Sequence, residues 1–102
     1  MHALNNPAMA YHWVNIATVK RHEALARSLG VSTVARSPRG FLRAYQAAGG
    51  SARAMNATRV PGYPNQTWGQ RRNAYIARHL PQYRQRPTER RRLALMVWAY
   101  QV

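Results

Sequence analysis

The sequence predicts an all-α fold, a compact bundle of three to four main helices over residues 15–102, preceded by an extended N-terminal arm over residues 1–14. Three observations predict this class. Apolar residues recur at helical spacing, helix start and stop signals bracket them, and no segment alternates apolar and polar residues as a half-buried strand does. A chain of 102 residues is long enough for a single helical domain with a modest core.

The first helix is predicted from Ile16 to Leu29, because its apolar side chains share one side and Gly30 is a typical stop signal. Glu23 precedes Arg27 by one helical turn, and this spacing predicts an ion pair between them.

A second helix is predicted with Ser37 as its N-cap, Pro38 at its first position and its end at Gly49. A short helix is expected over residues 52–57. Residues 60–65 contain two prolines and a tyrosine, which predict an ordered, turn-rich loop.

Thr67 and Gln70 have the spacing of a capping box and predict the start of a third, long helix. Pro81 is expected to end this helix, because proline disfavours a helical residue before it. Arg72 and His79 fall within the apolar arc of this helix, so both side chains need partners.

A last helix is predicted to start near Thr88, directly after Pro87. From Leu93 onward it is apolar all round, which is typical of a helix at the centre of a small bundle. Ten aromatic residues are expected to fill a thin core that phosphate binding at the surface would stabilise.

The charge balance indicates the partner. Fifteen of the sixteen Lys and Arg residues are arginine, the only carboxylate side chains are Glu23 and Glu89, and the formal net charge is +14. Self-repulsion of this size favours a polyanionic partner, and the guanidinium group binds phosphate through paired hydrogen bonds. A GC-rich genome would also raise the arginine content, but it would not remove the acids.

The most informative cluster is Arg90–Arg92, because three cations at the first turn of a helix oppose its macrodipole. Further basic residues lie on the third helix and on the connector between the third and last helices. Together with this cluster they predict a continuous surface that binds nucleic-acid backbone. Two more arginines project from the second helix. The alternative is a solvated cationic face that serves only solubility. The candidate contacts are Arg39, Arg43, Arg71, Arg72, Arg78, Arg84, Arg86, Arg90, Arg91 and Arg92.

Two tyrosines lie near these arginines. Tyr75 and Tyr83 could stack on the bases of a single-stranded ligand, although core packing is the expected role of Tyr75. A helix-turn-helix reading of residues 25–36 is disfavoured, because Ser37 and Pro38 interrupt the second helix after one turn.

Catalysis is not expected. Two isolated carboxylates cannot supply a paired acid and base, the four histidines lack zinc-ligand spacing, and the chain contains no cysteine. We therefore expect a non-enzymatic protein without cofactor, metal or small-molecule substrate. The N-terminal stretch lacks the features of a signal peptide, and no apolar run is long enough to cross a bilayer, so neither secretion nor a membrane partner is expected.

A further pattern is spread over residues 34–100. It comprises Val34–Leu42, Ala44, Tyr45, Ala48–Gly50, Trp68, Arg71, Arg72, Tyr75–Leu80, Pro87, Thr88, Arg90, Arg91, Leu93–Leu95 and Trp98–Tyr100. This pattern resembles a small basic domain of unassigned function that recurs in large DNA viruses and bacteriophages. The resemblance implies a viral or phage origin and assigns no activity or residue role.

The sequence thus favours an arginine-rich structural protein that contacts DNA or RNA backbone, together with other proteins, in a virion or another intracellular nucleoprotein assembly. Two alternatives stay open. A minor capsid or cement protein would direct its arginines at acidic coat-protein surfaces, and a ribosomal or mitoribosomal protein would bind ribosomal RNA. A membrane-active peptide is disfavoured, because the apolar residues are needed for a core.

Overall fold

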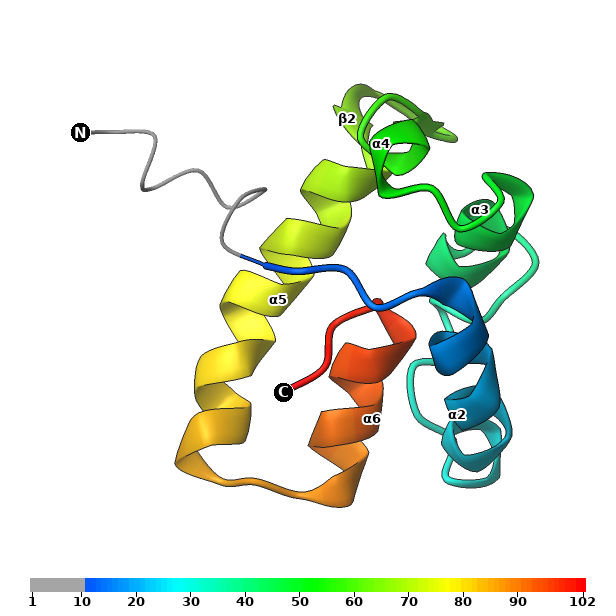
Figure 1. Cartoon of the computed structure of the whole chain (residues 1–102). Helices are drawn as coiled ribbons and strands as arrows, with labels where there is room; N and C mark the ends of the chain where they lie inside the picture. Colours follow the sequence, from blue (N-terminus) through cyan, green and yellow to red (C-terminus); the bar gives the residue numbers. More distant parts are fainter. Residues whose placement is uncertain (1–10) are drawn as a thin grey trace.

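A computed structural model describes residues 11–102 (Figure 1). These residues form five helices and one two-stranded antiparallel sheet. The helices are α2 (Ile16–Ser28), α3 (Phe41–Ala47), α4 (Ala52–Met55), α5 (Trp68–Gln85) and α6 (Glu89–Val97), and the strands are β1 (Arg59–Val60) and β2 (Tyr63–Thr67). The fold is therefore mixed, and the prediction of an all-α protein is wrong.

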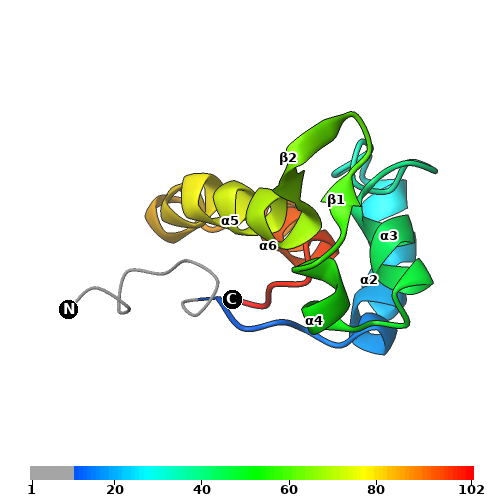
Figure 2. The same cartoon turned by 90° about the horizontal axis from the view of Figure 1, so that it is seen from above.

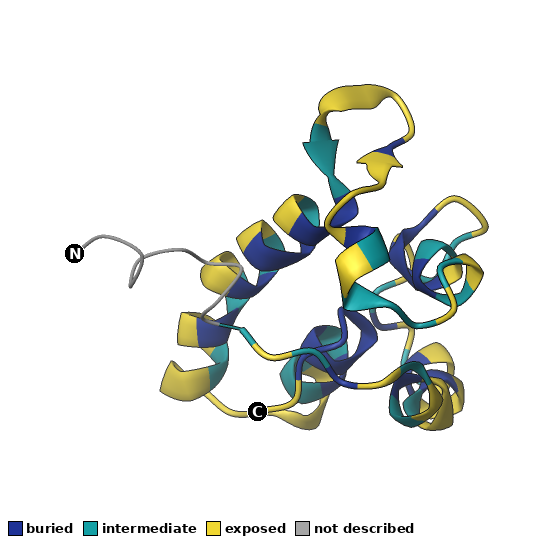
Figure 3. Ribbon diagram, turned by 45° about the horizontal axis from the view of Figure 1, so that its top comes forward, coloured by how far each residue is buried: buried dark blue, intermediate teal, exposed yellow. Residues whose placement is uncertain are grey.

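The sheet is a hairpin built on the segment predicted as a loop. Gly62 has a φ of +83°, in the left-handed region that glycine adopts without strain. Pro61 precedes it in the turn, and Val60 pairs with Tyr63 across the hairpin. Most residues of the strands are exposed, so the alternation of apolar and polar residues that reveals a half-buried strand is missing here. The hairpin projects from one end of the molecule (Figure 3).

Helix α6 lies between α5 and α2 and supplies much of the core (Figure 1). Its side chains from Leu93 onward are buried except for the half-buried Ala94. Thr88 caps the helix by accepting a hydrogen bond from the backbone N–H of Arg91 at 3.1 Å. Both the predicted start of the last helix and its central position are confirmed.

Helix α2 also agrees with its prediction to within one residue. Its side-chain cap is Asn15, and the chain turns at Gly30 with a φ of +65°. Arg27 lies 3.1 Å from the carboxylate of Glu23, which confirms the predicted ion pair.

The second predicted helix begins later than expected, at Phe41. The Ser37 hydroxyl donates backwards to the Val34 carbonyl at 2.7 Å, so it does not cap a helix. Residues 32–40, the turn segment, form turns and bends and pack against the start of α3. A Cβ on Gly40 would lie 2.3 Å from the Val34 carbonyl oxygen, so only glycine permits this packing. The turn segment contains no helix that could serve as a recognition helix.

Helix α5 continues through Pro81 to Gln85, so the predicted end at Pro81 is wrong. Proline removes one backbone donor, which in a helix leaves the carbonyl four residues earlier without its partner. Both Pro81 and Ala77 are exposed, so water can hydrate that carbonyl and the cost stays small enough for the helix to continue. The capping box at the start of α5 is confirmed, with Thr67 and Gln70 bonded reciprocally at 3.1 and 2.8 Å.

The N-terminal segment crosses α5 and passes the carboxyl end of α6, in front of the helices in Figure 1 and below them in the view from above (Figure 2). The backbone N–H of Val14 donates to the Ala99 carbonyl at 2.9 Å, and the Trp13 ring lies against Phe41 and Tyr45. Residues 11–14 of the predicted arm are therefore packed on the core, whereas residues 1–10 lie outside the described residues. Among the helices of residues 11–102, none has the length and apolar character needed to traverse a bilayer.

Candidate nucleic-acid interface

Both carboxylate side chains of the protein are used within the fold. Glu23 lies 2.6 Å from Lys20 and 3.1 Å from Arg27, and Glu89 lies 2.6 Å from Arg92. The Lys20 hydrogen bond lowers the pKa of Glu23 against the effect of burial, and the Arg92 hydrogen bond lowers that of Glu89. These pairs occupy three of the sixteen Lys and Arg side chains. The other thirteen, all arginines within residues 11–102, form no ion pair with a described carboxylate.

One of these thirteen, Arg72, is completely buried, with 0% of its surface exposed. Its guanidinium donates to the backbone carbonyls of Trp98 at 3.1 Å, Ala99 at 3.0 Å and Tyr11 at 3.0 Å, and to that of His12. The side chain of Asn73 accepts a further bond at 2.8 Å, and the guanidinium carbon lies 4.1 Å from the Trp13 ring centroid.

Burial lowers the pKa of Arg72 to about 10, so the group still carries its charge at neutral pH. Two of its acceptors, the carbonyls of Trp98 and Ala99, follow the carboxyl end of α6, where the helix macrodipole is negative. Arg72 therefore neutralises a helix end inside the protein. It is not accessible to an external phosphate, and we correct its assignment as a nucleic-acid contact.

The predicted cluster at Arg90–Arg92 has local partners in the fold. Arg90 donates to the Leu29 carbonyl at the end of α2, Arg91 donates to the Arg86 carbonyl at 2.8 Å, and Arg92 pairs with Glu89. Each guanidinium keeps N–H groups that these bonds do not use. The three side chains thus stabilise helix ends while their remaining donors can serve a ligand.

The junction of α5 and α6 carries further exposed arginines. Arg86 and Arg91 line a cavity of about 340 Å³ together with Gln82 and Gln85. Arg84 is exposed at the end of α5, and Arg78 is exposed earlier on the same helix, nearly two turns before it.

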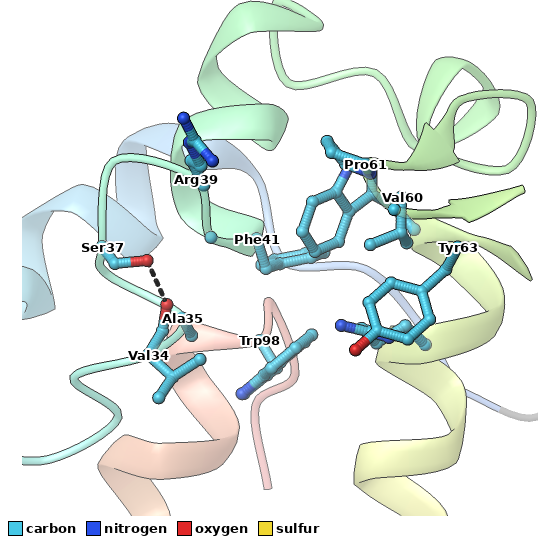
Figure 4. Close-up of a pocket in the computed structure, with 13 residues that line it drawn as sticks. Val34, Ala35, Ser37, Arg39, Phe41, Val60, Pro61, Tyr63 and Trp98 are labelled. Atoms are coloured by element: carbon cyan, nitrogen blue, oxygen red, sulfur yellow. Dashed lines mark hydrogen bonds between the residues drawn. The ribbon is translucent and has the colours of Figure 1, made fainter.

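Three adjoining cavities surround the hairpin. The first, of about 410 Å³, is lined by the turn segment, the hairpin, the start of α5 and Trp98 (Figure 4). The second, of about 420 Å³, shares Arg39, Pro61 and Trp68 with the first. The third, of about 460 Å³, shares Tyr63 and Arg71 with it. We call the surface formed by the three cavities the hairpin groove.

Three of the predicted contacts meet in the hairpin groove. Arg39 lines the first and second cavities, Arg43 lines the second, and Arg71 lines the first and third. They come from the turn segment, α3 and α5, which are brought together by the packing of the turn segment against α3 and by the direct connection of β2 to α5.

Arg71 is held in place by the hairpin. Its guanidinium carbon lies 4.1 Å from the ring centroid of Tyr63, and its Nε donates to the Gln66 side chain at 2.8 Å. The two terminal amino groups of the guanidinium bond to no described residue, so the forked end of Arg71 is available to a phosphate.

Aromatic rings form the inner wall of the first cavity. Phe41 lies 4.9 Å from Trp98 and 6.2 Å from Trp68, measured between ring centroids. Tyr75 also stacks on Trp98, with 4.8 Å between the ring centroids, and it contacts the His79 ring at 4.1 Å. Burial raises the pKa of Tyr75, as expected for a ring in the core. Packing is therefore the observed role of Tyr75. His79 is half-buried and contacts that ring, but it has no hydrogen bond to a described residue.

The aromatic part of this groove was not predicted from the sequence. Trp68 and Trp98 were expected only in the core, Tyr63 only in a loop, and Tyr83 as an open candidate for stacking, whereas it packs against the core near Leu80. The signal that could have located the groove is the Pro61-Gly62 pair between Val60 and Tyr63, which is typical of a tight hairpin turn. Within residues 11–102 we find no cluster of His, Asp or Glu side chains suited to a metal ion.

Comparisons of this chain with protein-family models, with curated proteins and with solved structures find no match. The assignment of function rests on the residues themselves.

Proposed function

We propose that this protein is a non-enzymatic, arginine-rich structural protein that binds the phosphate backbone of nucleic acid in a virion or another nucleoprotein assembly. The observation that supports it is the charge balance within the fold. Thirteen arginines have no carboxylate partner among residues 11–102, and all of them except Arg72 are at least partly exposed.

The exposed arginines suit a phosphate ligand in two further ways. Several are fixed by one neutral acceptor each, which lowers the conformational entropy that binding would cost, and they keep other N–H groups for the ligand. They also gather in two places, the hairpin groove and the junction of α5 and α6. A backbone-binding surface of this kind would be tolerant of sequence and strongly dependent on salt.

The test is the salt dependence of binding to DNA and RNA oligonucleotides, followed by fluorescence anisotropy. The variant Arg39→Gln/Arg43→Gln removes two charges from the hairpin groove. Its matched control, Arg21→Gln/Arg53→Gln, removes two exposed charges that line none of the three cavities. We expect the slope of log K against log salt to fall by about 1.4 to 1.8 in the first variant, from roughly 0.7 to 0.9 per phosphate contact, and by much less in the control.

Two results would contradict the proposal. An equal decrease of the salt slope in both variants would show that the arginines attract nucleic acid only through the net charge of the protein and not through contacts in the hairpin groove. Tighter binding to polyglutamate than to any oligonucleotide of the same charge would favour the alternative partner, an acidic protein surface.

A further inference from the structure

We propose that the first cavity of the hairpin groove accommodates one unpaired nucleobase, with the flanking phosphates on Arg39 and Arg71. This inference rests on the proposed function and refines it, because it assigns single-stranded nucleic acid as the ligand of this surface.

The cavity has the size and lining of a site for a small, flat ligand. Its volume of about 410 Å³ lies within the range of roughly 300 to 1,000 Å³ that is usual for small-molecule sites. Most lining side chains are apolar or aromatic, and the only charged ones are Arg39 and Arg71. Such a site favours a ligand with a planar, hydrophobic part and an anionic part.

Tyr63 provides the surface on which a base can stack. Its side chain is 53% exposed although it is a large aromatic residue, and Arg71 covers one face of the ring. Figure 4 shows Tyr63 on the hairpin side of the cavity and Trp98 on the side of α6. Stacking on an aromatic ring suits any base, because every base has a π face.

Trp98 offers a hydrogen-bond donor within the same cavity. The residue as a whole is 8% exposed, but its indole N–H is open to solvent, because among residues 11–102 the only buried side-chain polar atom without a partner is the Ser32 hydroxyl oxygen. The indole N–H donates to no described residue, so the exocyclic and ring acceptors of a base could accept a hydrogen bond from it. Val34, at the rim, is 79% exposed, so an apolar contact is also available there.

The arginines suit the phosphates on either side of such a base. Arg39 has no hydrogen-bond or ion-pair partner among the described residues, and the forked end of Arg71 is equally available. Both faces of a base are occupied by stacking in a duplex, so only a base splayed out of a single strand could meet Tyr63. Charge complementarity and the aromatic wall together therefore favour single-stranded nucleic acid over a duplex.

The test measures the affinity of the full chain for three ligands of equal length: oligothymidylate, the same backbone carrying abasic sites, and a duplex. Tyr63→Leu removes the stacking surface without changing charge, and Tyr63→Phe is the matched control that keeps the ring. Circular dichroism checks that both variants fold, which we expect because Tyr63 is half exposed.

We expect the native protein to bind oligothymidylate about five- to 150-fold more tightly than the abasic strand, from the usual contribution of one stacked base. Tyr63→Leu should lose most of this preference and Tyr63→Phe should keep it, while the salt slope stays the same in both. The inference is overturned if the abasic strand or the duplex binds as tightly as oligothymidylate, or if Tyr63→Leu retains the preference. Failure of the proposed function is distinct, because then no oligonucleotide binds with a phosphate-dependent salt slope.

Discussion

Replacing Arg72 tests the most unusual part of the core. Its guanidinium fastens the N-terminal segment and the end of α6 to α5, through carbonyls that lie up to 61 residues away in the sequence. In Arg72→Met the aliphatic stem is kept and the five hydrogen bonds are lost. We expect the protein to fold less stably because the carbonyls stay in place without their donor.

The size of the effect follows from these acceptors. Of the four carbonyls, that of Ala99 keeps the N–H of Val14 as a donor, and the other three lose the donor that Arg72 supplies. An unsatisfied buried group costs about 1 to 3 kcal/mol, and the two carbonyls on the N-terminal segment can be hydrated in part, so we expect a loss of about 3 to 5 kcal/mol. That is a large share of the roughly 5 to 15 kcal/mol that stabilises a typical domain.

Urea unfolding monitored by circular dichroism measures this loss. Arg78→Met, on the exposed side of the same helix, is the control and should change the free energy of unfolding by less than about 0.5 kcal/mol. Arg72→Lys separates charge from geometry. An ammonium group has three donors and cannot reach all five acceptors, so this variant should be destabilised as well.

Two results would refute the reasoning. One is a loss below about 1 kcal/mol in Arg72→Met, which would mean that the carbonyls do not depend on this donor. The other is a lower salt slope of nucleic-acid binding for Arg72→Met under conditions in which this variant is folded, which would place the Arg72 charge at the surface.

Three further predictions concern the arginines at the start of α6, the dependence of stability on pH in the acidic range, and the turn segment. Replacing Arg90–Arg92 together by Gln should reduce the salt slope on duplex DNA by up to about 2.7, from roughly 0.9 per phosphate contact, and an unchanged slope in anisotropy titrations would exclude this cluster from the interface. The pKa of Glu23 in the folded protein is below its ordinary value of 4.5, so the ionised carboxylate should stabilise the fold above pH 4.5, and this effect should be lost as the pH falls through the folded pKa. The urea midpoint of Glu23→Gln should therefore depend less on pH in that range than the midpoint of the native protein. Gly40→Ala should lower the free energy of unfolding by about 1 to 3 kcal/mol, because its Cβ would collide with the Val34 carbonyl; a neutral effect would show that the turn segment shifts easily.

The parts of the fold that the sequence predicts correctly depend on neighbouring residues. The caps at Thr67 and Thr88 and the stop at Gly30 each involve groups within one or two turns of a helix, so their signals are complete in a short stretch of sequence. The central position of α6 is also readable, because its side chains are apolar on every side.

The errors arise where the decisive partner is solvent or is distant in the sequence. Pro81 was expected to end α5, but only an exposed carbonyl loses its donor there. The place of Arg72 among apolar residues shows that it needs partners. Four of its five partners, however, are backbone carbonyls of residues 11–12 and of the two residues after α6, and a backbone carbonyl has no signature in the sequence. The hairpin groove is likewise assembled from three separate segments, so its arginines were named without the aromatic residues around them.

Thr67 is both the last residue of β2 and the N-cap of α5, so strand passes into helix without an intervening linker. The eighteen residues of α5 therefore fix a separation of roughly 27 Å between the hairpin groove and the arginines at the α5–α6 junction. A single-stranded oligonucleotide shorter than this separation could occupy only one of the two places at a time. A longer one could bind both at once, and its affinity should rise abruptly at that length through the higher effective concentration of the second contact.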